Sequence, residues 1–140
     1  MALETTGAVL DAVYPAHATC LAEIRRDVAD AATGCGADAI VLQQIGLAVS
    51  EAATNAILHA YPQREPGGDL YVRVRHAGAE FLDVSICDEG IGIAPGRVSP
   101  GMGLGLSLMA HEAYSFEIRT SPEDGTEVVL RFRIARPGRG

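Results

Sequence analysis

The sequence predicts an α+β fold, a two-layer sandwich whose mostly antiparallel or mixed sheet of about five strands carries three helices on one face. Short segments of alternating apolar and polar residues follow one another closely enough to pair as hairpins. Two long segments repeat apolar residues at helical spacing, and a shorter helix is expected after a glycine-rich segment. A length of 140 residues suits one domain, so we expect a single domain over 1–140, with a frayed tail at 136–140.

The elements are expected in the order strand, helix, helix, strand, strand, helix, strand, strand. Strands are expected at 7–14, 70–75, 81–87, 116–119 and 126–134. Helices are expected at about 17–33, 38–61 and 104–113. Gly34 and Gly36 should end the first helix, and Asp38 should cap the start of the second. Tyr61 and Pro62 should end the second helix, since a residue before proline disfavours helical geometry.

The composition argues against several classes of function. The net charge is −7 and all 11 basic residues are arginine, which makes general nucleic-acid binding a poor fit. No apolar run reaches the roughly 18 residues of a membrane span, and no secretion signal opens the chain, so we expect a cytoplasmic protein. The cysteines and histidines show no metal-ligand spacing. The lack of lysine excludes a Walker-type loop, so a nucleotide site would hold phosphate by other means.

The second helical segment carries two polar residues on one face. Glu51 and Asn55 are four positions apart, so their side chains project side by side from a helix. The opposite face is apolar and is expected to be buried; it comprises Leu42, Ile45, Val49, Ala53, Ala56 and Ala60. From this segment alone, a functional site and an ordinary solvated face are both open interpretations.

The segment after the third predicted strand suits a flat ligand. Gly90 and Gly92 carry no Cβ, so a ligand can lie against the backbone there. Asp88, at the strand end, can accept a hydrogen bond from an exocyclic amine. Such an acceptor selects adenine over guanine, because guanine presents a carbonyl oxygen at the corresponding position. A simple turn is the alternative interpretation of these residues.

A second glycine-rich segment opens the third predicted helix. It places Leu104 among three alternating glycines, Gly101, Gly103 and Gly105. Free backbone N–H groups at a helix start, together with the helix dipole, bind anions without needing lysine. A flexible loop is the alternative, and the segment does not follow the first strand of a βαβ unit as a Rossmann motif does.

A bound nucleotide would give the polar face of the second helix a chemical role. The amide oxygen of Asn55 suits Mg²⁺ whose other ligands are phosphate oxygens and waters. Glu51, one turn away, is placed to accept a proton from a water or hydroxyl that attacks the γ-phosphate. ATP and Mg²⁺ are therefore the expected ligands.

In their order along the chain, these three segments resemble the N box, G1 box and G2 box of the GHKL ATPases, which share the Bergerat fold. The resemblance spans about 42–130. Residues 50–56, residues 59–62 and the Gly125-Thr126 pair look most like the bacterial anti-sigma factor serine/threonine kinases. The resemblance implies Glu51 as general base, Asn55 as Mg²⁺ ligand, Asp88 as adenine reader and Thr126 as further adenine support. It also implies nucleotide contacts at Gly90, Gly92, Gly101, Gly103, Leu104 and Gly105.

The resemblance implies a function as well. Kinases of this family phosphorylate a serine or threonine of a STAS-type anti-anti-sigma partner, sequester a sigma factor and usually form homodimers. Arg25 and Arg26 would contact the sigma factor, unless they form a solvated helix face. Only about eight residues, 93–100, separate the glycine-rich segments, so the lid over the phosphates of a bound nucleotide must be short. A short lid suits a kinase, in which a hydroxyl of the partner protein must reach the γ-phosphate. The alternative is a non-catalytic module that binds ATP and regulates a partner by sequestration.

Overall fold

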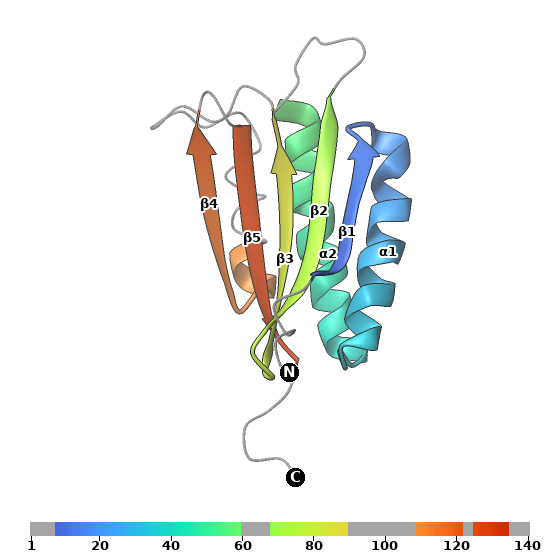
Figure 1. Ribbon diagram of the computed structural model, residues 1–140, viewed down its shortest axis with the longest axis vertical. Helices are drawn as coiled ribbons and strands as arrows, with labels where there is room; N and C mark the ends of the chain where they lie inside the picture. The colour runs from blue at the N-terminus through green and yellow to red at the C-terminus, as the bar shows by residue number, and fades with distance from the viewer. Residues whose placement is uncertain (1–7, 60–67, 90–108, 122–124, 135–140) are drawn as a thin grey trace.

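The computed structural model describes residues 8–59, 68–89, 109–121 and 125–134. Five strands form one sheet in the order β1-β2-β3-β5-β4, and each neighbouring pair is antiparallel. The strands are β1 (Ala8–Pro15), β2 (Asp69–Ala77), β3 (Phe81–Asp88), β4 (Ser115–Ser121) and β5 (Gly125–Arg133). Two long helices, α1 (Leu21–Gly34) and α2 (Ala39–His59), lie side by side against one face of this sheet (Figure 1). The predicted α+β sandwich is therefore confirmed.

Several strand ends differ from the predicted ones, because ladder hydrogen bonds set them where periodicity gives no signal. β3 continues through Asp88, which pairs with Thr126 of β5. β1 includes Pro15, whose missing N–H is tolerated because β1 is an edge strand. β4 extends beyond the predicted 116–119 at both ends. β5 ends before Ile134, whose N–H donates instead to the carbonyl of Glu80 at 2.8 Å.

α1 begins one short turn later than predicted. A 3-10 turn, η2 (Ala18–Cys20), precedes it, and Nδ1 of His17 accepts a hydrogen bond from the N–H of Thr19 at 3.2 Å. Gly34 is the last residue of α1, and Gly36 follows with a φ of +101°. This left-handed conformation suits glycine and ends the helix where the sequence predicts.

Asp38 caps the start of α2, as predicted. Its Oδ1 accepts a hydrogen bond from the N–H of Val41 at 2.9 Å, which satisfies a donor that has no partner inside the helix. The predicted end of this helix at Tyr61 and Pro62 lies outside the described residues. None of the described helices is long and apolar enough to cross a lipid bilayer.

The buried face of α2 is rotated slightly from the predicted one. Its fully buried residues are Ile45, Ala48, Val49, Ala52 and Ala53. Leu42 and Ala56 are only partly buried, and Ala60 lies outside the described residues. Alanine contributes little to a hydrophobic pattern, yet its small side chain lets a helix pack closely on a sheet. The prediction placed the buried face opposite Glu51 and Asn55, whereas the face that packs on the sheet is rotated toward them and includes Ala48 and Ala52.

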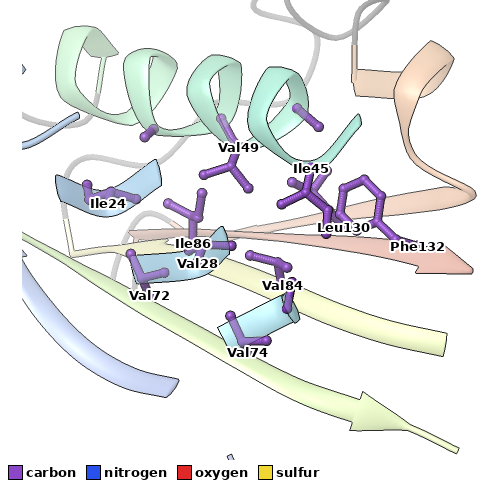
Figure 2. Close-up of a cluster of buried hydrophobic side chains, with 14 of the residues drawn as sticks. Ile24, Val28, Ile45, Val49, Val72, Val74, Val84, Ile86, Leu130 and Phe132 are labelled. Carbon is purple, nitrogen blue, oxygen red and sulfur yellow. The ribbon is translucent and has the colours of Figure 1, made fainter. Parts of the chain in front are cut away.

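The core lies between the two layers. Alternate residues of the central strands point toward the helices and are buried; they are Leu70, Val72, Val74, Leu82, Val84, Ile86, Leu130 and Phe132. Figure 2 shows side chains of α1 and α2, among them Ile24 and Val49, packed against this surface. Met109, in the described part of the third predicted helix (109–112), is buried in the same cluster. Each such side chain contributes about 1.5–3 kcal/mol on burial, so the core fixes α2 over the sheet.

Neither α1 nor α2 covers the opposite face of the sheet (Figure 1). Charged side chains pair on this face. Arg131 of β5 donates two hydrogen bonds to Asp83 of β3, at 2.8 and 3.0 Å. Arg73 of β2 and Asp11 of β1 form a longer ion pair of 3.6 Å. A slip of one residue would exchange these charged side chains with the buried apolar ones, so the alternation specifies the strand register.

Candidate functional site

The described residues with predicted chemical roles gather at one end of the sandwich. β3 ends there with Asp88, β5 begins there with Gly125, and the C-terminal half of α2 lies at the same end (Figure 1). Glu51 and Asn55 belong to that half of α2. The fold therefore brings the predicted base and metal ligand to the end of the sheet that carries the predicted adenine reader.

Asp88 is a buried acid supported by the neighbouring strand. Its exposed fraction is 5%, and that of its ladder partner Thr126 is 9%. The backbone N–H of Thr126 donates to Oδ1 of Asp88 at 3.3 Å. Because a buried carboxylate is costly unless hydrogen-bond donors surround it, this site suits a ligand that brings N–H donors. The exocyclic amine of adenine is such a donor, so Asp88 and Thr126 fit the predicted binding of adenine.

Gly125 allows the start of β5 to lie directly against the end of β3. Its φ is +85°, and a Cβ at this position would collide with the main-chain oxygen of Asp88 and lie 2.8 Å from Cα of Glu89. Any other residue would strain the backbone and push the two strand ends apart. Since Thr126 follows immediately, this close approach brings its N–H to the carboxylate of Asp88.

A third strand contributes a hydroxyl to the same place. Thr120 of β4 is the ladder partner of Thr126, and their Oγ1 atoms are 3.1 Å apart. Asp88, Thr126 and Thr120 thus form a polar row across β3, β5 and β4. The row faces the helices, because Ile86 and Val128, two positions away in their strands, belong to the core or pack against it.

Glu51 and Asn55 lie on a firmly packed part of α2. Their neighbours Ala52 and Ala53 are buried in the core, whereas Glu51 and Asn55 themselves are half-buried. A half-buried carboxylate beside a half-buried carboxamide keeps a fixed position and stays accessible to a ligand. This placement fits the predicted roles of base and Mg²⁺ ligand, since an amide oxygen is a ligand that Mg²⁺ accepts.

Arg25 and Arg26 are exposed on α1. Arg25 donates to Oγ of Ser50, the residue before Glu51, at 3.4 Å. Arg26 forms an ion pair of 3.7 Å with the adjacent Asp27. Their exposure is compatible with the predicted contact to a partner and equally with a solvated helix face.

The glycines predicted to lie against the base and the predicted phosphate-binding segment are outside the described residues. This applies to Gly90, Gly92, Gly101, Gly103, Leu104 and Gly105, whose roles stay predictions. Within the part of the chain that the structure describes, no group of three or more His, Cys, Asp or Glu side chains could hold a metal ion. Mg²⁺ bound by one amide oxygen together with phosphate oxygens and waters requires no such group.

One contributor to the site, Thr120, was not predicted. Thr120 continues the alternation of Phe116 and Ile118, so a longer strand prediction would have included it. A contact on the uncovered face of the sheet was not predicted either: the hydroxyl of Tyr71 donates to Oε1 of Glu89 at 3.1 Å, just beyond the end of β3. A contact between side chains 18 positions apart on different elements leaves no periodic signal in the sequence.

Comparison with known proteins agrees with this fold. The sequence profile of the histidine kinase-like ATPase domain matches residues 14–132. The chain belongs to this family, and membership implies that the domain binds ATP. The resemblance to the GHKL ATPases, and within them to the anti-sigma factors, is thereby confirmed.

Two individual proteins and one solved structure illustrate the similarity. The sensor histidine kinase PdtaS of Mycobacterium tuberculosis is 32% identical over 99 residues, which cover 66% of this chain and 20% of that protein. The anti-sigma F factor of Shouchella clausii is 33% identical over 104 residues, which cover 66% of this chain and 70% of that protein. The structure of the RsbU and RsbW domains of Rv1364c from M. tuberculosis matches with a TM-score of 0.68 at 23% identity. That match covers 93% of this chain and 33% of the other, and it shows a shared fold.

Proposed function

We propose that this protein is an ATP-binding anti-sigma factor with serine/threonine kinase activity. It phosphorylates a STAS-type anti-anti-sigma partner and sequesters a sigma factor, acting as a single-domain homodimer in the cytoplasm. The similarity to an anti-sigma F factor over 70% of that relative's length supports the regulatory role. One structural observation carries the nucleotide-dependent part of the proposal: the buried Asp88, held by Thr126, lies at the same end of the fold as Glu51 and Asn55.

Asp88 selects the base of the nucleotide. One carboxylate oxygen accepts the backbone N–H of Thr126, and the carboxylate accepts the 6-amino group of adenine as well. Guanine would place its carbonyl oxygen against the same carboxylate, so two acceptors would face each other in a buried site. Selection of ATP over GTP therefore follows from the burial and fixed position of one side chain.

Glu51 acts as the general base. Its carboxylate takes the proton of the partner's serine or threonine hydroxyl, whose oxygen bonds to the γ-phosphorus. The bond between that phosphorus and the β–γ bridging oxygen breaks, and ADP leaves with the electron pair. Asn55 would hold Mg²⁺ through its amide oxygen, and the bound ion would offset phosphate charge. Because Glu51 and Asn55 are one turn apart on a packed helix, the base and the metal ligand keep a fixed mutual position.

Phosphate transfer tests this proposal. Candidate partners are captured from native cells with and without ATP, and transfer from Mg-ATP is followed for the parent protein and Glu51→Gln. Loss of a positioned general base should slow transfer by about 100-fold or more. ATP affinity should change little, since the substitution keeps the shape of the side chain. Glu23→Gln, in the exposed first turn of α1, is the matched control and should transfer phosphate normally.

The other outcomes are equally informative. Transfer that is unchanged in Glu51→Gln would assign the base to another residue. Tight ATP binding without transfer to any captured partner would favour a non-catalytic module that sequesters its partner. A parent protein that binds no ATP would contradict both versions.

A further inference from the structure

We propose that Thr120 is a positioning residue for adenine recognition. Its hydroxyl donates to the hydroxyl of Thr126, which in turn donates to ring nitrogen N1 of adenine, directly or through one water. The inference rests on the proposed function, because it takes Asp88 and Thr126 as the residues that face the base. It brings β4, a strand that the nucleotide motifs do not include, into the recognition of the nucleotide.

The geometry of the polar row carries this inference. Thr126 is its central member and is buried, with its backbone N–H 3.3 Å from Oδ1 of Asp88 and its Oγ1 3.1 Å from Oγ1 of Thr120. The three residues are ladder partners on neighbouring strands, so the backbone fixes their spacing. Thr120 is exposed on the edge strand β4.

The chemistry of the adenine edge sets the direction of the hydrogen bonds. A threonine hydroxyl has one hydrogen to donate and two lone pairs that accept. Adenine presents its 6-amino group as a donor and the adjacent N1 as an acceptor. Asp88 accepts from the amine, so N1 requires a donor, and the hydroxyl of Thr126 is the neighbouring donor in the row. Its hydrogen is then directed to the base, and Thr120 must donate to Thr126.

A chain of hydroxyls is stronger than its separate links. When Thr120 donates to Thr126, it polarises the Thr126 hydroxyl and makes it a better donor to N1. It also holds the rotamer of a β-branched side chain that has few alternatives in a strand. Thr120 should therefore influence ATP binding without touching the nucleotide itself.

Equilibrium binding of ATP to the purified protein tests this relay, the chain of hydrogen bonds from Thr120 through Thr126 to N1 of adenine. Thr120→Val removes the hydroxyl and keeps the shape, and it should weaken ATP binding about three- to tenfold. Thr120→Ser restores the hydroxyl and should bind within about twofold of the parent. Thr33→Val is the matched control: its hydroxyl donates to the carbonyl of Ala29 at 2.8 Å near the C-terminal end of α1, and its loss should leave ATP affinity unchanged.

Two further arms separate a relay from a general effect on the fold. In a Thr126→Val background, adding Thr120→Val should cost less than twofold, because the link to the base is already broken. With 1-deaza-ATP, which lacks N1, the parent and Thr120→Val should bind equally. Thr120→Ala, which also lacks the hydroxyl, provides a second variant, and circular dichroism confirms that each variant is folded.

The possible results are distinguishable. Unchanged ATP affinity in folded Thr120→Val and Thr120→Ala would overturn the inference. A penalty that persists with 1-deaza-ATP or in the Thr126→Val background would overturn it too, since Thr120 would then act only on the fold. A parent that binds no ATP, or binds it without dependence on Asp88, would contradict the proposed function itself.

Discussion

At the scale of single residues, Cys87 and Asp88 are neighbours in β3 that face opposite sides of the sheet. Asp88 points toward the helices and is held by Thr126. Cys87 lies on the uncovered face opposite Glu127 in the β3–β5 ladder. Burial, followed by the nearby carboxylate of Glu127, raises the pKa of the Cys87 thiol to about 11. The alternation of one strand thus separates a ligand-binding acid from a thiol that stays protonated at neutral pH.

This thiol predicts a measurable pH dependence. In the folded protein, the rate of Cys87 alkylation by iodoacetamide should keep rising about tenfold per pH unit through pH 9.5, because the raised pKa lies near 11. In urea the rate should level off above about pH 8.5, the ordinary value for a thiol. Peptide mass spectrometry after timed quenching follows this cysteine alone.

The same shift has a consequence for stability. Because the folded-state pKa lies above the unfolded one, the favourable contribution of the protonated thiol is complete below about pH 8.5. It is lost as the pH rises from there toward about 11. A levelling of the alkylation rate near pH 8.5 in the folded protein would contradict the shift.

At the scale of elements, the contact between the end of β3 and the start of β5 depends on Gly125. Gly125→Ala should lower the free energy of unfolding by about 1–3 kcal/mol through backbone strain, with a further loss from the collision with Asp88. Urea unfolding measures the stability. ATP binding should weaken as well, because the variant moves Thr126 away from the carboxylate of Asp88.

Gly78 offers a matched control for that prediction. It lies in the turn between β2 and β3 with a φ of +77°, and a Cβ there would meet nothing within 4 Å. Gly78→Ala should therefore show the strain alone and leave ATP affinity unchanged. Equal losses of stability and affinity in both variants would show that the collision at Gly125 has no separate effect.

Element types follow from the sequence, but their ends do not. The two periodicities identify all five strands and both long helices, because each element buries one face and leaves the other in water. The extra residue Asp88 of β3 and the longer β4 depend on which neighbour completes the ladder. Ala48 and Ala52 were missed because the buried face was placed opposite Glu51 and Asn55, while packing on the sheet decides the actual rotation of the helix.

At the scale of the whole molecule, ligand binding should appear as added stability. Mg-ATP at about 100 times its dissociation constant should stabilise the parent by about 2.7 kcal/mol, which corresponds to roughly 5–10 °C in Tm for a domain of this size. Asp88→Asn replaces the acceptor with a group that also carries donors, so the shift should largely disappear. Thermal unfolding by circular dichroism, with and without Mg-ATP, measures the difference.

A surface aspartate controls for charge. Asp11→Asn removes an exposed carboxylate of β1 that pairs with Arg73 at 3.6 Å, and the ATP-induced shift should persist in it. A full shift in Asp88→Asn would remove Asp88 from the nucleotide site.

The site could be predicted from the sequence only where its residues belong to recognisable segments. Glu51 and Asn55 share one helical turn, and Asp88 precedes a glycine-rich segment, so each could be named without a structure. The hydroxyl of Thr120 and the close approach at Gly125 arise from strand pairing. Strand pairing is decided by the whole sheet, which a local pattern does not contain.

The order of strands also bears on when the adenine-reading pair comes into existence during folding. β2 and β3 join across a short turn, and β4 and β5 are neighbours in sequence, so both hairpins close small loops. By contrast, Thr126 meets Asp88 across 38 positions, and Arg131 meets Asp83 across 48. Closing such long loops costs more chain entropy, so we expect the β3–β5 ladder to form after the hairpins. A nascent chain on the ribosome therefore cannot form the Asp88–Thr126 pair until β5 has been synthesised. Nucleotide binding through this pair should begin only after that point.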